Sequence, residues 1–339
     1  MKLIRKILFP FVPLYYLVTW TRNKLFDFGL KQSTSYNIPI ICVGNLSTGG
    51  TGKTPMIEYL IRLLKANFKI ATLSRGYKRK TKGFVLASPI TTVNDIGDEP
   101  FQFYNKFKQD VTVAVDANRN NGIKMLRQLD HNLEVILLDD AYQHRYVKAG
   151  FNILLSTYSN LYTNDMVLPT GNLREPRSGA QRAHAIIVTK CPIGITKQDK
   201  AAVLSKIKPT KGQMVFFSVI KYASFVYGSA GQLTLKQLPK KFTLVTGIAN
   251  AKPLVNYLKR KNATFEHLNY NDHYNFTKQD VINLQEKTCI VTTEKDYMRL
   301  KQYKSIKHKL YYLPIEAHLD DADAFKELVT NFLSNFKHY

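Results

Sequence analysis

Residues 38–55 decide the fold, and they read IPIICVGNLSTGGTGKTP. Their first six residues, 38–43, form a short apolar run that predicts a buried strand. A loop with four glycines and the pair Lys53-Thr54 follow, and apolar residues then recur at helical spacing over 56–64. A strand, a glycine-rich loop, Lys-Thr and a helix in this order predict a phosphate-binding loop.

Phosphate binding requires these residue types. Glycines allow successive backbone N–H groups to turn toward a phosphate, and the start of the following helix adds the positive end of its dipole. We expect Lys53 to reach the β- and γ-phosphates of a nucleotide, and the Thr54 hydroxyl to bind Mg²⁺. The predicted nucleotide-binding residues are Asn45, Ser47, Thr48, Gly49, Gly50, Thr51, Gly52, Lys53 and Thr54.

Two features of the loop leave alternatives open. Ser47 stands where the general pattern has its first glycine, so a glycine-rich turn without a ligand is one alternative. The run GGTGKT also occurs in partitioning ATPases, but these carry an additional lysine where this chain has Thr48. A P-loop ATPase switch of that type, acting at a membrane or on nucleic acid, is therefore an alternative function.

Composition narrows the class of protein. The 339 residues suffice for two domains of ordinary size, and a hydrophobic fraction of 45% provides a substantial core. The formal net charge of +24 indicates a polyanionic partner, which can be a nucleic acid, an anionic membrane or a phosphorylated substrate. The three cysteines are scattered, which disfavours a disulfide framework or a zinc site and fits a reducing compartment.

The N-terminal segment is apolar and aromatic with basic flanks. Its uncharged run, 7–20, is short for a bilayer span and is interrupted by Pro10 and Pro13. We therefore predict an amphipathic helix over 1–32 that lies on a membrane surface; a helix packed on the protein's own core is the alternative. The side chains expected to face lipid headgroups are Lys2, Arg5, Lys6, Arg22 and Lys24.

Strand and helix patterns alternate from residue 38 onward, which predicts an α/β fold with a mostly parallel, P-loop NTPase-like sheet and ligands at the carboxyl ends of its strands. A segment rich in Pro, Gly and Arg, 168–182, is interpreted as a functional connection or lid. The predicted domains are a core over 33–183 and a second, smaller α/β domain over 184–339. Helices are predicted at 98–107 and 120–129, and strands at 69–74, 111–115, 133–138, 152–155, 185–189, 214–220, 242–246, 264–268, 289–293 and 310–313.

Two carboxylates at a strand end form a candidate metal site. The run 133–140, LEVILLDD, is an apolar strand that ends in Asp139 and Asp140. By itself, Asp-Asp after a strand is common turn chemistry. Beside a Gly-Lys-Thr loop, however, such an acidic group can bind Mg²⁺ directly or through water, so metal binding is the favoured interpretation.

Three other segments carry candidate chemistry. Asp98 stands at the start of a predicted helix, where its spacing alone favours an N-cap. Asp272-His273 follows a predicted strand and is either a surface pair or a site where His273 works with a carboxylate as general base. Arg75 follows another strand, where an arginine either clamps phosphate or is a solvated charge.

Several of these segments converge on one family. The chain resembles tetraacyldisaccharide 4′-kinase, the lipid A 4′-kinase of Gram-negative bacteria, over most of its length. The similar stretches are VGNLSTGGTGKTP at 43–55, SRGY at 74–77, GDEP at 97–100, DDAYQHR at 139–145, GNLREP at 171–176, DHY at 272–274 and TEKD at 293–296. The resemblance implies ATP-dependent phosphorylation of the 4′-hydroxyl of a tetraacylated glucosamine disaccharide 1-phosphate, and two α/β domains with the nucleotide between them.

The resemblance also implies roles for individual residues. Asp98 would be the catalytic base, paired with His273, which replaces the N-cap interpretation, while Lys53 would serve the phosphates. The implied metal and polar shell comprises Thr54, Glu99, Asp139, Asp140 and Glu175. The implied substrate contacts are Arg75, Tyr77, Arg119, Gln143 and His144.

The cofactors and partners follow from the same resemblance. ATP and Mg²⁺ are the implied cofactors, and the partners are a lipid A disaccharide precursor and the anionic surface of the inner membrane. We expect a monomer, peripheral on the cytoplasmic face of that membrane. A nucleic-acid partner is not expected, because only the net charge suggests one and no binding motif is present.

Overall fold

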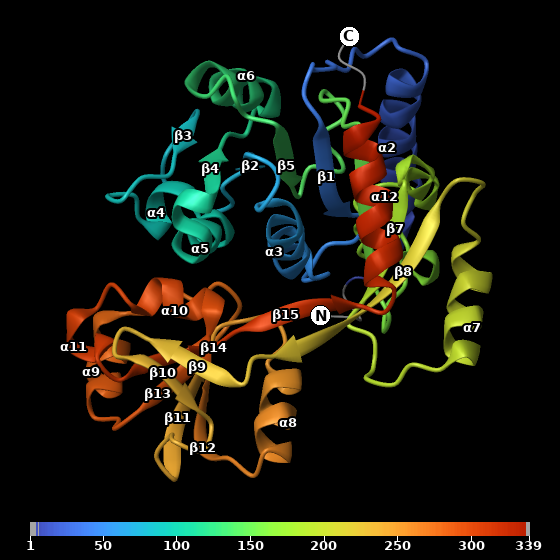
Figure 1. Cartoon of the computed structure of the whole chain (residues 1–339). Coiled ribbons are helices and arrows are strands. Elements are labelled where there is room, and N and C mark those ends of the chain that lie inside the picture. The colour runs from blue at the N-terminus through green and yellow to red at the C-terminus, as the bar shows by residue number, and fades with distance from the viewer. Residues whose placement is uncertain (1–4, 6, 337–339) are drawn as a thin grey trace.

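The computed structural model describes residue 5 and residues 7–336, which form two α/β domains with one sheet each (Figure 1). The strands of the larger sheet lie in the order β15-β8-β7-β6-β1-β5-β2-β4-β3. Those from β8 to β4 are parallel, and β15 and β3 pair antiparallel at the two edges. The bounds are β1 Ile40–Asn45, β2 Ile70–Ser74, β3 Val85–Leu86, β4 Val111–Val115, β5 Val135–Asp139, β6 Phe151–Thr157, β7 Ala185–Thr189, β8 Met214–Tyr222 and β15 Ile315–Leu319.

Helices cover both faces of this sheet, so its central strands are buried and their sequences are continuously apolar. Every residue of β1 is buried. One face packs on α3 Lys53–Leu64, α5 Asp98–Phe107 and α12 Ala322–Ser334. The opposite face packs on α6 Arg119–Leu129 and α7 Lys197–Ile207. Short helices in this domain are α4 Val93–Ile96, η2 Lys108–Asp110, η3 Tyr162–Asn164 and η4 Arg177–Arg182.

The smaller sheet has the order β10-β9-β14-β13-β11-β12, with its central strands β14, β13, β11 and β12 parallel. One of its faces shares a hydrophobic cluster with α5 of the first domain, so the two domains are packed together. Its strands are β9 Phe225–Gly228, β10 Gly231–Thr234, β11 Lys241–Thr246, β12 Thr264–Asn269, β13 Ile290–Thr293 and β14 Leu310–Leu313. Its helices are α8 Lys252–Arg260, α9 Lys278–Gln285, α10 Glu294–Leu300 and α11 Lys304–Lys307.

The predicted elements agree closely with those observed. The helix 98–107 and the strands 111–115, 185–189 and 310–313 have the predicted bounds. The strand before the phosphate-binding loop begins and ends two residues later than predicted. Its end lies later because Gly44 and Asn45 still pair with β6. Strands β3, β9, β10 and β15 were not predicted. The α/β class with mostly parallel sheets is confirmed.

The predicted domain limit at 183/184 does not coincide with the division between the sheets. Strands β7 and β8 follow that limit but continue the larger sheet, and β15 and α12 return to it at the end of the chain. The segment 168–182 is not a linker between domains, since Leu173 is buried in the first core. The chain enters the second domain after β8 and leaves it before β15, and these strands pair antiparallel where they pass between the domains (Figure 1).

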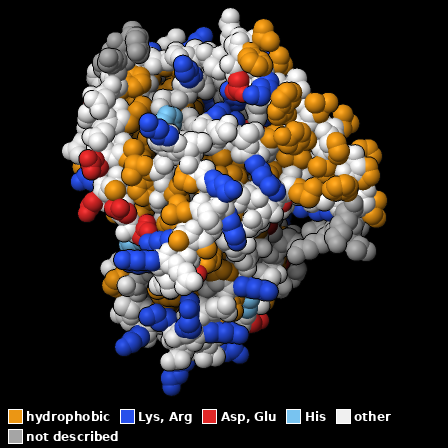
Figure 2. All heavy atoms as spheres, turned by 90° about the vertical axis from the view of Figure 1, so that its right-hand side faces the viewer, with side chains coloured by type: hydrophobic (Ala, Val, Ile, Leu, Met, Phe, Trp, Pro, Cys, Tyr) orange, Lys and Arg blue, Asp and Glu red, His pale blue; other side chains and the backbone are white. Residues whose placement is uncertain are grey.

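The N-terminal helix α2, Val12–Asp27, lies on the larger domain and follows the short helix η1, Phe9–Phe11. Only Val12, Asn23 and Phe26 of α2 are buried, so the rest of the helix is open to solvent to differing degrees. Hydrophobic side chains gather over this helix (Figure 2). Those exposed by a third or more on η1, α2 and the adjoining turns are Ile7, Leu8, Phe9, Phe11, Leu14, Tyr16, Leu17, Val18, Trp20, Phe28 and Leu30.

Two of the basic residues that were predicted to face lipid headgroups also form hydrogen bonds within the protein. Arg5 donates a hydrogen bond to the side chain of Asn172, and Arg22 donates one to the Gln143 carbonyl oxygen. These guanidinium groups therefore fasten the segment to the protein. Lys2 and Lys6 lie outside the described residues. None of the described helices is long and apolar enough to cross a bilayer.

Candidate active site

The phosphate-binding loop connects the buried end of β1 to the start of α3. Gly52 caps the amino end of α3 with a φ of +91°, and Gly49 has a φ of +105°. Side chains other than glycine rarely adopt this left-handed conformation, so the two glycines allow the turn into the helix. Inside the loop, Asn45 donates a hydrogen bond of 2.7 Å to the Thr51 hydroxyl.

Neighbouring segments hold this loop in place. Thr189, at the end of β7, donates to the Thr51 carbonyl oxygen at 2.7 Å. Lys190 donates to the Gly50 carbonyl oxygen. The Thr48 N–H donates to the Asn172 carbonyl oxygen, which brings the segment 168–182 onto the loop. Lys190 therefore brings a second ammonium group to the loop that carries Lys53.

The two carboxylates after β5 have opposite electrostatic environments. Asp140 lies 3.6 Å from the Lys53 ammonium and 3.0 Å from the Arg174 guanidinium. Burial opposes its ionisation, but these two charges outweigh burial and lower its pKa. Asp139 is buried, and burial, followed by the charge of Asp140, raises its pKa to about 7. One hydroxyl, that of Ser74, donates to its Oδ2, whereas Oδ1 has no hydrogen-bond partner among the described residues.

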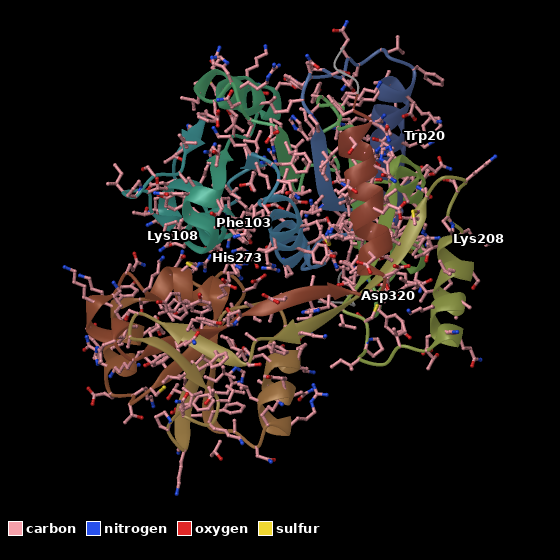
Figure 3. All side chains as sticks on the ribbon, in the orientation of Figure 1. Trp20, Phe103, Lys108, Lys208, His273 and Asp320 are labelled. Atoms are coloured by element: carbon pink, nitrogen blue, oxygen red, sulfur yellow. The ribbon has the colours of Figure 1, made fainter. Side chains whose placement is uncertain are left out.

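Asp98 and His273 are hydrogen bonded across the two domains, as predicted from the resemblance. Figure 3 shows His273 on the side of the second domain that faces the first. The His273 Nδ1 lies 2.9 Å from Asp98 Oδ2, and the Lys295 ammonium lies 2.8 Å from His273 Nε2. Because an ammonium group can only donate, Nε2 accepts the hydrogen bond from Lys295. The ring hydrogen is therefore on Nδ1, which donates a hydrogen bond to Asp98. Burial opposes ionisation of Asp98, but the hydrogen bonds from His273 and Arg299 lower its pKa to about 2.

The interpretation of Asp98 as an N-cap is wrong. Gly97 occupies the cap position of α5, and none of the described side chains caps this end. Asp98, Glu99 and His273 bring ligand atoms within 4.8 Å of one another. Glu99 also lies 3.4 Å from the Lys295 ammonium, and its charge contributes to the raised pKa of Asp139. The carboxylates of α5 and β5 therefore influence each other across the carboxyl edge of the sheet.

Glu175, predicted in the metal shell, accepts hydrogen bonds from three side chains. Arg182 donates to both of its carboxylate oxygens at 2.8 and 2.9 Å, Asn23 donates at 2.7 Å and Gln143 at 2.9 Å. These four contacts tie Glu175 to the surrounding chain, and its role in the metal shell stays a prediction. Gln143 also donates to the Asn45 carbonyl oxygen, which connects Glu175 to the phosphate-binding loop.

Three of the other predicted substrate contacts, Arg75, Arg119 and His144, are basic residues that lie close enough for the arginine charges to act on His144. Arg75 and Tyr77 are exposed after β2, and the Tyr77 ring lies edge-on to His273 with centroids 5.5 Å apart. Arg119 is buried and its Nε has no partner among the described residues. Burial, together with the charge of Arg119, lowers the pKa of His144 to about 4.

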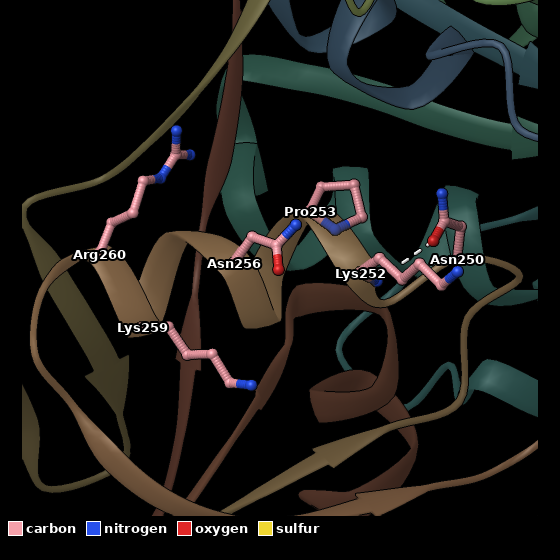
Figure 4. A pocket seen from close by; sticks show the side chains of 6 residues that line it. All are labelled: Asn250, Lys252, Pro253, Asn256, Lys259 and Arg260. Carbon is pink, nitrogen blue, oxygen red and sulfur yellow. Dashed lines mark hydrogen bonds between the residues drawn. The ribbon is translucent and has the colours of Figure 1, made fainter.

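Some residues of the site were not predicted. Arg299 and Lys295 on α10, Lys190 after β7 and Arg182 in η4 all contact predicted site residues. Lys295 lies in the TEKD segment, which the resemblance had included, but the motif did not indicate that Lys295 contacts His273. A separate pocket on α8 is lined by none of the predicted site residues; its lining is Asn250, Lys252, Pro253, Asn256, Lys259 and Arg260 (Figure 4).

A phosphate-binding loop at the carboxyl edge of a parallel sheet, with acidic groups at the ends of neighbouring strands, defines the protein as a P-loop phosphotransferase. The family model described as tetraacyldisaccharide-1-P 4′-kinase, LpxK, matches residues 4–334. The chain belongs to this family, which makes it an ATP-dependent 4′-kinase of lipid A biosynthesis and confirms the function predicted from the motifs. The alternative of a partitioning-type ATPase is thereby excluded.

Individual relatives agree with this assignment. The chain is 53% identical over 321 residues to tetraacyldisaccharide 4′-kinase of Flavobacterium johnsoniae, covering 94% of this chain and 93% of that protein. It is 44% identical to the enzyme of the same name from Phocaeicola vulgatus, covering 97% and 95%. A crystal structure of LpxK from Aquifex aeolicus in complex with ATP has a TM-score of 0.78 at 29% identity, covering 97% of this chain and 99% of that one.

Proposed function

We propose that this kinase transfers the γ-phosphate of ATP to the 4′-hydroxyl of a tetraacyldisaccharide 1-phosphate, with Asp98 as the proton acceptor. The observation that carries the proposal is the hydrogen bond between Asp98 and His273, which come from different domains. Their pair lies beside Glu99, whose charge acts on Asp139 at the carboxyl edge of the first sheet. A proton acceptor next to the phosphate-binding edge is what transfer to an alcohol requires.

The proposed step is an in-line displacement. The 4′-hydroxyl oxygen forms a bond to the γ-phosphorus while the bond from that phosphorus to the bridging oxygen of ADP breaks, and the hydroxyl proton moves to Asp98. The Lys53 ammonium balances charge on the transferring phosphoryl group. The His273 Nδ1–H donates a hydrogen bond to Asp98 and thereby fixes the orientation of the carboxylate.

The residues of the site fit a magnesium ion. The Asp139 Oδ1 is buried and has no partner among the described residues, which is the arrangement expected of an oxygen that binds a metal ion. We propose that Asp139 and the Thr54 hydroxyl hold Mg²⁺, with Asp140 and Glu99 close by. When bound, Mg²⁺ neutralises negative charge on the nucleotide phosphates.

We also propose a peripheral position on the cytoplasmic face of the inner membrane, because the acyl chains of the substrate lie in a bilayer. Support comes from the row of exposed apolar side chains on α2. Wild-type protein should float with vesicles containing phosphatidylglycerol, and the variant Leu14→Asp, Leu17→Asp should remain largely in solution. The matched control is Ile90→Asp, which changes a side chain that is 89% exposed elsewhere in the first domain. Equal flotation of all three proteins would contradict the proposal.

Radiolabel transfer from γ-labelled ATP to purified disaccharide precursor tests the reaction itself. The wild type should label the lipid, Lys53→Ala should not, and Asp98→Ala should lose about 10²- to 10⁴-fold in kcat with its fold intact. Hydrolysis of ATP at an equal rate with and without the acceptor would oppose the assignment of the acceptor. Full activity of Asp98→Ala would remove Asp98 from the mechanism.

A further inference from the structure

A buried guanidinium group is one of the contacts between helix α10 of the second domain and helix α5 of the first. Arg299 is 8% exposed, and its side chain makes four polar contacts, one of which places Nη2 3.2 Å from His273 Nδ1. Its Nε donates to Asp98 Oδ1 at 2.7 Å, its Nη2 donates to Asp98 Oδ2, and its Nη1 donates to the Tyr274 carbonyl oxygen at 2.7 Å. One side chain therefore holds both Asp98 and the residue that follows His273.

These contacts decide which atom of Asp98 is free to accept a proton. Each carboxylate oxygen has two acceptor positions. Oδ2 accepts from Arg299 Nη2 and from His273 Nδ1, so both of its positions are used. Oδ1 accepts from Arg299 Nε alone among the described donors, which leaves one position at this atom.

We propose that Arg299 is a positioning residue for phosphate transfer: its forked guanidinium aligns the Asp98 carboxylate with His273 and leaves Oδ1 to receive the proton of the acceptor hydroxyl. The inference rests on the proposed role of Asp98. Because Arg299 belongs to the second domain, the proton acceptor is assembled only when α10 is docked on α5. A lysine cannot replace this function, since an ammonium group is a point charge and not a planar fork.

The same interface offers a matched control. Lys301 follows α10, donates a hydrogen bond to the Asn105 side chain on α5, and lies over the Phe101 ring with its ammonium 4.5 Å from the centroid. Lys301→Met removes a cation and a hydrogen bond between the domains without touching Asp98. If Arg299 only ties the domains together, changing either residue should have the same consequence.

The experiment measures kcat, and KM for ATP, of Arg299→Met, Arg299→Lys and Lys301→Met with purified disaccharide acceptor. We expect kcat of Arg299→Met to fall about 100-fold, because a small misplacement of a reacting group has an effect of this size, while KM for ATP stays unchanged. Added guanidinium ion should restore part of the lost kcat, and Arg299→Lys should stay below the wild type. Lys301→Met should keep the wild-type kcat.

Three results would overturn the inference: a wild-type kcat in Arg299→Lys with an intact fold, equal losses in Arg299→Met and Lys301→Met, or no response to guanidinium. If Arg299→Met does not fold, Arg299→Lys decides. The double variant Asp98→Asn, Arg299→Met should be no slower than Asp98→Asn alone, because Arg299 acts through Asp98. Activity in Asp98→Asn would refute the proposed function, whereas an inactive Asp98→Asn with fully active Arg299 variants would refute the inference alone.

Discussion

Replacing Asp139 by asparagine should stabilise the protein and abolish its activity. The carboxyl of Asp139 is buried, receives one hydrogen bond from Ser74 and lies beside the charged Asp140. Asparagine has nearly the same shape and no charge, so it removes the cost of burying a charge while leaving the packing of β5 in place. The same change removes the oxygen that we assign to Mg²⁺, which is a conflict between stability and function expected at active sites.

The magnitude follows from proton linkage. Burial raises the pKa of Asp139 from its ordinary 3.8 to about 7. A group whose pKa is raised by folding contributes stability that is fully present below pH 3.8 and is lost as the pH rises through about 7. At about 1.4 kcal/mol for each pH unit, the interval between 3.8 and about 7 corresponds to about 4 kcal/mol. Asp139→Asn should therefore gain up to about 4 kcal/mol at pH 8 and almost nothing at pH 4.

Urea denaturation at pH 4, 6 and 8, in EDTA and without nucleotide, measures this difference in the free energy of unfolding. Asp140→Asn is the matched control. Burial opposes ionisation of Asp140, but the charges of Lys53 and Arg174 outweigh burial and lower its pKa. Its ionised form stabilises the fold above its ordinary pKa, so this variant should be less stable than the wild type at pH 8. A wild-type pH dependence in Asp139→Asn, or a loss of stability at pH 8, would refute the reasoning.

Three further changes test the packing around the site. Lys106→Met removes the cation between the buried carboxylates of Glu58 and Glu294. The free energy of unfolding, measured in urea, should fall by about 3–5 kcal/mol, with Lys106→Arg as the milder control. Gly44→Ala places a Cβ 2.6 Å from that of Tyr142 and should cost about 1–3 kcal/mol, so an unchanged Tm would contradict the close approach. Asn23→Ala removes the hydrogen bond from α2 to Glu175 and should cost about 1–2 kcal/mol, whereas Asn23→Asp should cost more because it adds a second carboxylate there.

The part of the site that sequence predicts best is the part made by neighbouring residues. The glycines, Lys53 and Thr54 belong to one turn, and their spacing alone specifies the conformation that binds phosphate. Asp139 and Asp140 were located in the same way, because an apolar run that ends in acids marks the carboxyl end of a strand. The pairing of Asp98 with His273 came from resemblance and not from spacing, and the residues are brought together only by docking of the domains.

Glu175 shows why a residue type does not define a role. The segment 171–176 marked it as functional, but its environment depends on Asn23 and Arg182, which come from other parts of the chain. The domain limit is a similar case. Local composition changes near 168–182, yet the larger sheet takes in β7, β8 and finally β15, because pairing between distant strands has no local signature.

The chain by itself determined a parallel α/β fold, the phosphate-binding loop and the family, since each depends on short-range patterns of apolar residues, glycines and charged motifs. Only the tertiary structure decided which charges meet: Arg299 with Asp98, Lys190 with the loop, and the N-terminal helix with Glu175. Such contacts depend on how α10, β7 and α2 pack against the first core. This packing depends on contacts between residues that are far apart in the chain, and no local pattern in the sequence encodes it.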